Sequence, residues 1–181
     1  GLVLFAILMM NQTACTGAVL QMLSHGLMTA LFFALIGMIY GRTHTRDIRE
    51  LNGLMKIMPF LSVCYVIAGL ANLGLPGLSG FIAEMTIFNG AFQHPDVFHR
   101  TWTIIACTSI VITAVYILRL VGKILYGTCT NKHHLELTDA TWDERTAVII
   151  LIVCVAGLGL APLWMSNMIS DSVLPLVQVF R

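Results

Sequence analysis

Glu84 is the only Asp, Glu, Lys or Arg between Lys56 and Asp96, in a stretch that is otherwise almost entirely apolar. A carboxylate at membrane depth costs at least a few kcal/mol, so such residues usually mark the path of an ion or a proton. A purely structural hydrogen-bond network is the alternative. We predict that Glu84 takes up and releases protons.

His25 is the one residue within 1–41 that is expected to titrate near neutral pH. Gln21 and Thr29 lie four residues before and after it, on the same face of a helix, with Ser24 at the edge of this polar stripe. The sequence leaves two interpretations open, a proton relay and a packing residue. A haem ligand is disfavoured because no second suitably spaced histidine lies in a span.

A second polar stripe follows the span that begins after Arg100. Its members recur every three or four residues and are Ser109, Thr113, Tyr116, Arg119 and Lys123. Such a stripe can line a chain of water molecules, or it can hold helices together by hydrogen bonds. It is a candidate for a water-lined path to the charged end of the helix.

The stretch LGLPGLSG at 73–80 interrupts the helix that carries Glu84. Pro76 removes a backbone donor and clashes with the preceding turn, while Gly74, Gly77 and Gly80 ease an unwound backbone. Broken helices recur at ion sites of membrane transporters. We predict a discontinuous helix at this point, with a simple proline kink as the alternative.

The elements that must hold these residues are membrane helices. The 181 residues are 57% hydrophobic and only 10% charged, with a mean hydropathy of +0.86 and a net charge of +1. Soluble domains carry about 25% charged residues, so an all-α transmembrane bundle is predicted, with no footprint for nucleic acid. We expect one membrane domain over 1–181. Its predicted parts are the end of a helix at 1–10, spans at 15–41, 57–93, 101–122 and 146–163, and an interfacial tail at 164–181.

Lys and Arg residues decide whether 57–93 crosses the membrane once or twice. With a single span broken near 74–80, eight of the ten basic residues lie on one side, and two spans would split them six to four. Cytoplasmic loops collect basic residues, so one broken span is favoured. Residues 42–56 and 123–145 are then predicted to face the cytoplasm. Thr141 and Glu144 have the spacing of a capping box that begins the last span.

The cysteines suggest no metal centre. All five are scattered without a CxxC pair, so buried free thiols are expected. His133 and His134 stand together in a polar loop, but nothing near them in sequence completes a ligand set. No metal site is therefore predicted.

The stretches LSHGLMTALFFALIGMIYGRTHTRDI and LGLPGLSGFIAEM resemble one known family. From residue 1 to about 165 the chain is similar to the M-type (chain 4) antiporter-like membrane subunit of respiratory complex I, a relative of Mrp sodium/proton antiporter subunits. The resemblance implies a subunit of fourteen helices with two inverted repeats, of which this chain is the C-terminal part. His25 then matches the ionisable residue of the eleventh helix, and Glu84 matches the terminal proton residue of the broken twelfth helix.

The resemblance also implies a function and its surroundings. It predicts a proton-translocating subunit of an NADH:quinone oxidoreductase, in the bacterial cytoplasmic membrane or an organelle or thylakoid membrane. Neighbouring membrane subunits and lipid are the implied partners. NADH, FMN, iron–sulfur clusters and quinone are expected in other subunits, with no cofactor in this chain. The alternatives are an Mrp-type antiporter subunit, a membrane-bound hydrogenase subunit, and a scaffold that transports nothing.

Overall fold

The computed structural model describes residues 1–128 and 137–179, and every regular element in these two ranges is a helix. Cys129, His133 and His134 lie outside the described residues. The helices are α1 (Leu2–Leu8), α2 (Gln12–Thr43), α3 (Leu54–Ile57), α4 (Pro59–Asn72), α5 (Ser79–Phe92), α6 (Val97–Leu125), α7 (Trp142–Leu160) and α8 (Leu163–Val179). The predicted all-α bundle with a broken helix is confirmed.

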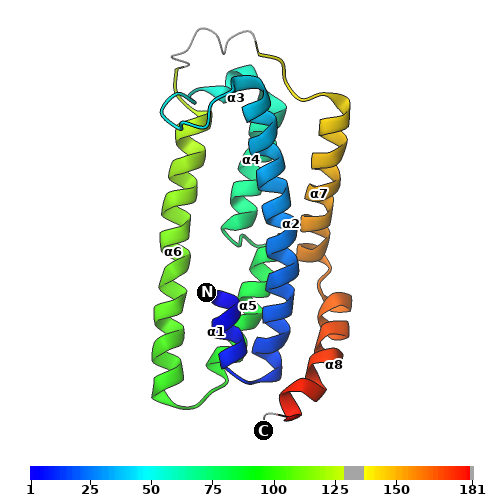
Figure 1. Cartoon of the computed structure of the whole chain (residues 1–181). Coiled ribbons are helices and arrows are strands. Elements are labelled where there is room, and N and C mark those ends of the chain that lie inside the picture. The colour runs from blue at the N-terminus through cyan, green and yellow to red at the C-terminus, as the bar shows by residue number, and fades with distance from the viewer. Residues whose placement is uncertain (129–136, 180–181) are drawn as a thin grey trace.

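The long helix α2 runs through the centre of the bundle (Figure 1). Helices α4 and α5 follow one another in line beside it, with α6 on one side and α7 and α8 on the other. The connection from α2 to α4 and the chain entering α7 lie at one end, whereas the turn between α5 and α6 lies at the other. Helices α4 and α5 thus lie end to end with a break between them, and the single crossing of 57–93 stays a prediction.

Two described helices are long and apolar enough to cross a membrane by themselves, namely α2 and α6. Helices α7 and α8 meet the same criteria only as a pair, bent by 72° at the break around Pro162. The tail predicted to lie at the interface is therefore a helix. Its residues Ile169, Val173 and Val177 pack in one cluster with Leu20 of α2 and Ala83 of α5.

Side-chain caps fix where several helices begin. Asn11 precedes α2, and its Oδ1 accepts a hydrogen bond from the amide of Ala14 at 2.7 Å. Asp96 caps α6 through the amide of His99. The predicted capping box at Thr141 and Glu144 is confirmed, with the Thr141 amide 2.8 Å from Glu144 Oε2. Each cap pairs amides that the first turn of a helix leaves without partners.

The break between α4 and α5 consists of two consecutive turns that the sequence specifies. Helix α4 ends in a Schellman motif: Gly74 is left-handed at φ +65°, its amide donates to Ala71 O, and the Leu75 amide donates to Leu70 O. Pro76 and Gly77 then form a tight turn closed by the Leu78 amide on Leu75 O at 3.1 Å. Gly77 has φ +95°, as the third position of a type II turn demands. The break is thus an ordered turn, which excludes the simple kink.

Candidate functional site

Glu84 lies directly against the break in its own helix. Its position on α5 turns the carboxylate back towards the end of α4, where Gly74 presents a bare α-carbon. A Cβ placed on Gly74 would stand 2.6 Å from Glu84 Oε2 and 3.1 Å from Cδ. Glu84 is half-buried, and no described residue forms a hydrogen bond or an ion pair with it. The structural hydrogen-bond network considered for Glu84 therefore does not exist among the described residues.

Neighbouring helices cover the broken backbone. Gly159 of α7 lies so close that a Cβ there would be 2.5 Å from Gly77 O and from Leu78 Cα. A Cβ on Gly80 would likewise be 3.3 Å from Met28 Sδ of α2. Irregular backbone at membrane depth is tolerated only where protein or a wet cavity surrounds it. Here α2 and α7 supply the protein.

A buried pair of hydroxyl groups joins α2 to the start of α5. Ser24 Oγ lies 2.7 Å from Ser79 Oγ, and both side chains are almost fully buried. Ser24 was predicted at the edge of the His25 stripe, and the structure gives it a partner in the stretch that ends the break. A hydroxyl both donates and accepts, so the pair connects the two predicted regions by a hydrogen bond that can reverse its direction.

His25 lies at an opening on the surface of α2. It lines a cavity of about 350 Å³ together with Gln21 and Met22 of α2 and with residues 1–3. Its Nδ1 is 3.4 Å from Thr29 Oγ1, so the predicted contact at four-residue spacing exists. His25 itself is exposed, whereas Gln21 is only 8% exposed. Both interpretations of His25, a proton relay and a packing residue, therefore stay open.

Gln21 holds an unsatisfied polar atom beside this cavity. Its Oε1 is buried and has no hydrogen-bond partner among the described residues. A buried acceptor without a partner costs about 1–3 kcal/mol, so native proteins usually satisfy it with water or another polar group. The cavity that Gln21 shares with His25 is large enough to hold several water molecules.

The polar stripe on α6 does not join the residues around Glu84. The hydroxyls of Ser109 and Thr113 donate to carbonyls of their own helix, those of Ala106 and Ser109. Tyr116, Arg119 and Lys123 are exposed on the same helix. The stripe therefore forms no hydrogen bonds to another described helix. The water-lined path along this stripe remains a prediction.

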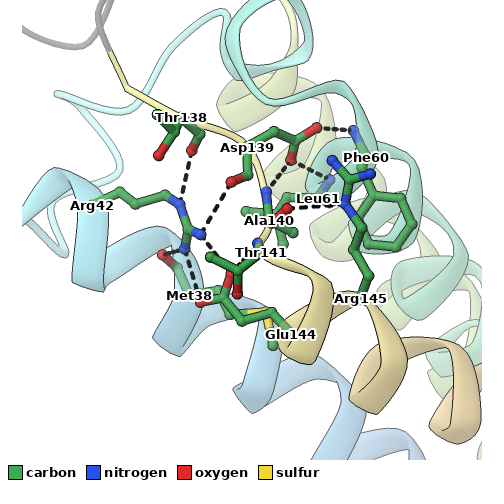
Figure 2. A network of polar contacts seen from close by, with 10 residues as sticks. All are labelled: Met38, Arg42, Phe60, Leu61, Thr138, Asp139, Ala140, Thr141, Glu144 and Arg145. Atoms are coloured by element: carbon green, nitrogen blue, oxygen red, sulfur yellow. Dashed lines mark hydrogen bonds and ion pairs between the residues drawn. The ribbon is translucent and has the colours of Figure 1, made fainter.

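A second polar network closes the end of the bundle at which α2 and α4 are connected (Figure 2). The Arg42 guanidinium holds both Glu144 oxygens, at 2.5 and 3.2 Å, and it also donates to the carbonyls of Met38, Thr138 and Asp139. The Asp139 carboxylate accepts from the amides of Phe60 and Leu61 and so caps α4, whose N-cap residue Met58 has no suitable side chain. One cation and two carboxylates thereby fasten α2, α4 and α7 together.

Two features of the site were not anticipated from the sequence. The contact of Glu84 with Gly74 spans ten residues and a change of chain direction, so no helical spacing indicates it. Ser79 was not singled out, because a serine next to Gly80 in LGLPGLSG is typical of a turn. A polar residue at the first position of α5 was the only available signal.

The sequence matches a known family and several curated relatives. Residues 1–113 match the family described as NADH:quinone oxidoreductase/Mrp antiporter, TM. The chain is 37% identical over 164 residues to NAD(P)H-quinone oxidoreductase chain 4 1 of Synechococcus elongatus, covering 90% of this chain and 31% of the relative. It is 34% identical over 182 residues to NADH-quinone oxidoreductase subunit M of Rhodobacter capsulatus, covering 100% of this chain and 35% of that protein. The chain thus spans about a third of the length of these relatives.

Solved structures share the fold at lower sequence identity. A chain of respiratory complex I from Thermus thermophilus with bound NADH superposes with a TM-score of 0.86 and 23% identity, over 99% of this chain and 36% of that one. A chain of the Mrp complex from Dietzia superposes with a TM-score of 0.79 and 17% identity, over 93% and 39%. With a matching family over residues 1–113 and the apolar helices described above, this chain is an integral membrane protein that belongs to the NADH:quinone oxidoreductase/Mrp antiporter transmembrane family.

Proposed function

We propose that this chain forms part of the proton path of a redox-driven NADH:quinone oxidoreductase of the complex I type. The observation that carries the proposal is the Glu84 carboxylate, half-buried against the broken helix with no counter-charge among the described residues. A carboxylate held by a permanent ion pair would stay ionised. Without such a partner Glu84 can exchange a proton when its hydration or a nearby charge changes.

The geometry suggests an order for proton movement. His25 would receive protons at the cavity that it shares with Gln21 Oε1, where water completes the hydrogen bonds. The Ser24–Ser79 hydroxyl pair leads from α2 to the first turn of α5, the helix that carries Glu84. Glu84 would then act as the terminal site. Release would follow towards the end of the bundle opposite the basic segment 42–56, which we assign to the cytoplasmic side.

Oxidation and reduction belong to other subunits in this proposal. NADH, FMN, iron–sulfur clusters and quinone are held there, and the energy reaches this chain through neighbouring antiporter-like and other membrane subunits. The names of the relatives support this division: those from Synechococcus elongatus and Rhodobacter capsulatus are a quinone oxidoreductase chain and a quinone oxidoreductase subunit. Several membrane complexes contain chains with this fold.

Replacement of Glu84 tests the proposal. Glu84→Gln keeps the shape but cannot ionise, so we expect the assembled complex to lose proton transport, and electron transfer to fall with it where the two are coupled. Glu84→Asp keeps the charge with a shorter reach, so partial transport is expected. The measurements are proton uptake and quinone reduction in reconstituted vesicles, normalised to assembled complex. Wild-type rates in Glu84→Gln together with a lower rate in Glu84→Asp would remove Glu84 from the path.

A sodium/proton antiporter subunit of the Mrp kind is the second candidate function. The likeness of fold to the Dietzia Mrp complex, with a TM-score of 0.79, is the observation in its favour. Proton transport that requires sodium, and that continues without a quinone substrate, would select this candidate. Transport driven by quinone reduction in sodium-free buffer would select the first.

A further inference from the structure

Three side chains with metal-binding atoms meet where α5 ends and α6 begins. His94, Asp96 and His99 each bring one ligand atom into a group whose members all lie within 4.8 Å of one another. The two imidazole rings are stacked, with centroids 4.4 Å apart and planes 19° from parallel. Nothing in the proposed proton path uses these residues. They lie at the end of the bundle opposite the Arg42 network.

A contact with a backbone carbonyl orients the His94 ring. Its Nε2 lies 2.7 Å from the carbonyl oxygen of Met9, in the turn between α1 and α2. A carbonyl can only accept, so with Nε2 as the donor to Met9 O the lone pair resides on Nδ1; Asn11 Nδ2 lies 3.3 Å from the same Nε2. Histidines that bind metals commonly donate their other N–H to a carbonyl or carboxylate in this way.

Asp96 and His99 contact each other directly. His99 Nδ1 contacts Asp96 Oδ2, and the same carboxylate caps α6 through the His99 amide. Both contacts place the Asp96 carboxylate beside the His99 ring at the start of α6. Pro95 between the two ligand residues removes backbone freedom from the segment that carries them.

We propose that His94, Asp96 and His99 form a binding site for a divalent zinc ion. Two imidazole nitrogens and one carboxylate oxygen are the ligand types that zinc accepts, with water in the fourth tetrahedral position. Ligand atoms around zinc are about 3.4 Å apart for bonds of about 2.1 Å, so binding requires the stacked rings of His94 and His99 to turn apart and His99 to release Asp96. A metal ion there would join the α1–α2 turn, through Met9 and His94, to the start of α6. No metal site was predicted from the sequence, where only the cysteines and the pair His133 and His134 were considered as ligands.

Direct measurement of zinc binding tests the proposal on the intact membrane assembly. Equilibrium dialysis with radioactive zinc is expected to give one more bound ion per assembly for the wild type than for His99→Gln. His94→Gln and His99→Gln are each expected to weaken this binding at least about 100-fold, since even outer-layer changes cost 10–100-fold. Asp96→Asn removes the negative charge of the ligand but keeps a side-chain oxygen that can cap α6. A loss of zinc binding in this variant therefore cannot be attributed to loss of the helix cap.

His44→Asn is the matched control. His44 is a histidine at the other end of the bundle, and asparagine tolerates its left-handed backbone at φ +53°. Its zinc binding is expected to equal that of the wild type. In the wild type, zinc is also expected to protect His94 and His99 from diethylpyrocarbonate, read by mass spectrometry, while His44 is modified equally with and without zinc. Equal zinc binding in wild type and all three site variants, or no protection of His94 and His99, would reduce the cluster to a helix cap and overturn the proposal.

Discussion

Replacement of Gly74 by alanine tests whether proton transport depends on the close contact between Gly74 and the Glu84 carboxylate. Gly74 has φ +65°, and a residue with a Cβ in this conformation costs about 1–2 kcal/mol. The new Cβ would also lie 2.6 Å from Glu84 Oε2. A normal approach between carbon and oxygen is about 3.3 Å, so the carboxylate has to move by at least about 0.7 Å. Misplacement of a reacting group by about 1 Å can lower a rate about 100-fold, so we expect proton transport to fall at least about tenfold.

Gly77→Ala supplies the control for backbone strain. Gly77 also has a positive φ, +95°, but the nearest atom to a new Cβ is Leu160 Cδ2 at 3.9 Å, an ordinary contact. Both variants are expected to lower the thermal stability of the assembled protein, and only Gly74→Ala is expected to abolish most transport. Addition of Glu84→Asp to Gly74→Ala withdraws the carboxylate by one methylene and is expected to recover part of the lost transport.

The assay is proton uptake in reconstituted vesicles, normalised to assembled complex, alongside a thermal unfolding curve for each variant. The reasoning is refuted if Gly77→Ala reduces transport as much as Gly74→Ala does. The loss would then follow from strain in the turn, and the contact between Gly74 and Glu84 would have no functional meaning.

Two further predictions concern α2 and the network at its end. His25→Lys is expected to keep more proton uptake than His25→Met. Both variants are expected to assemble equally, because His25 is exposed and fills no packed space. Normal transport in His25→Met would exclude a proton relay at this position. Glu144→Gln is expected to destabilise the protein by about 1.5–3 kcal/mol, because it removes the charge that holds the half-buried Arg42 guanidinium. The exposed Asp47–Arg49 pair is the comparison, and Asp47→Asn is expected to leave the unfolding temperature unchanged; equal effects of Glu144→Gln and Asp47→Asn would contradict the assigned role of the network.

Much of the fold was predictable because its signals are local. The capping box at Thr141 and Glu144 and the proline-glycine break were each predicted within a few residues of where they occur. Proline and glycine act on the backbone next to them, so their effect is visible without knowledge of the packing. The predicted span at 101–122 likewise falls inside α6, at Val97–Leu125.

The tail was harder to predict. The interfacial position of residues 164–181 stays a prediction, and the packing of α8 on α2 and α5 was not anticipated from the sequence. The Gln12 side chain reaches Ser170 Oγ at 2.8 Å and fixes α8 to the start of α2. An amphipathic helix has the same pattern whether it faces lipid headgroups or another helix, so only the arrangement of its neighbours decides between them.

The sequence by itself determined the membrane helices, the break and the two ionisable residues, because hydropathy and backbone sterics act over short distances. The tertiary structure decided what surrounds those residues. Glu84 lies against Gly74, Ser24 pairs with Ser79, and Asp139 caps a helix 79 residues before it. Contacts of this kind depend on how helices pack rather than on spacing along the chain. The function proposed for Glu84 rests on its surroundings, because among the described residues no ion pair holds its carboxylate permanently ionised.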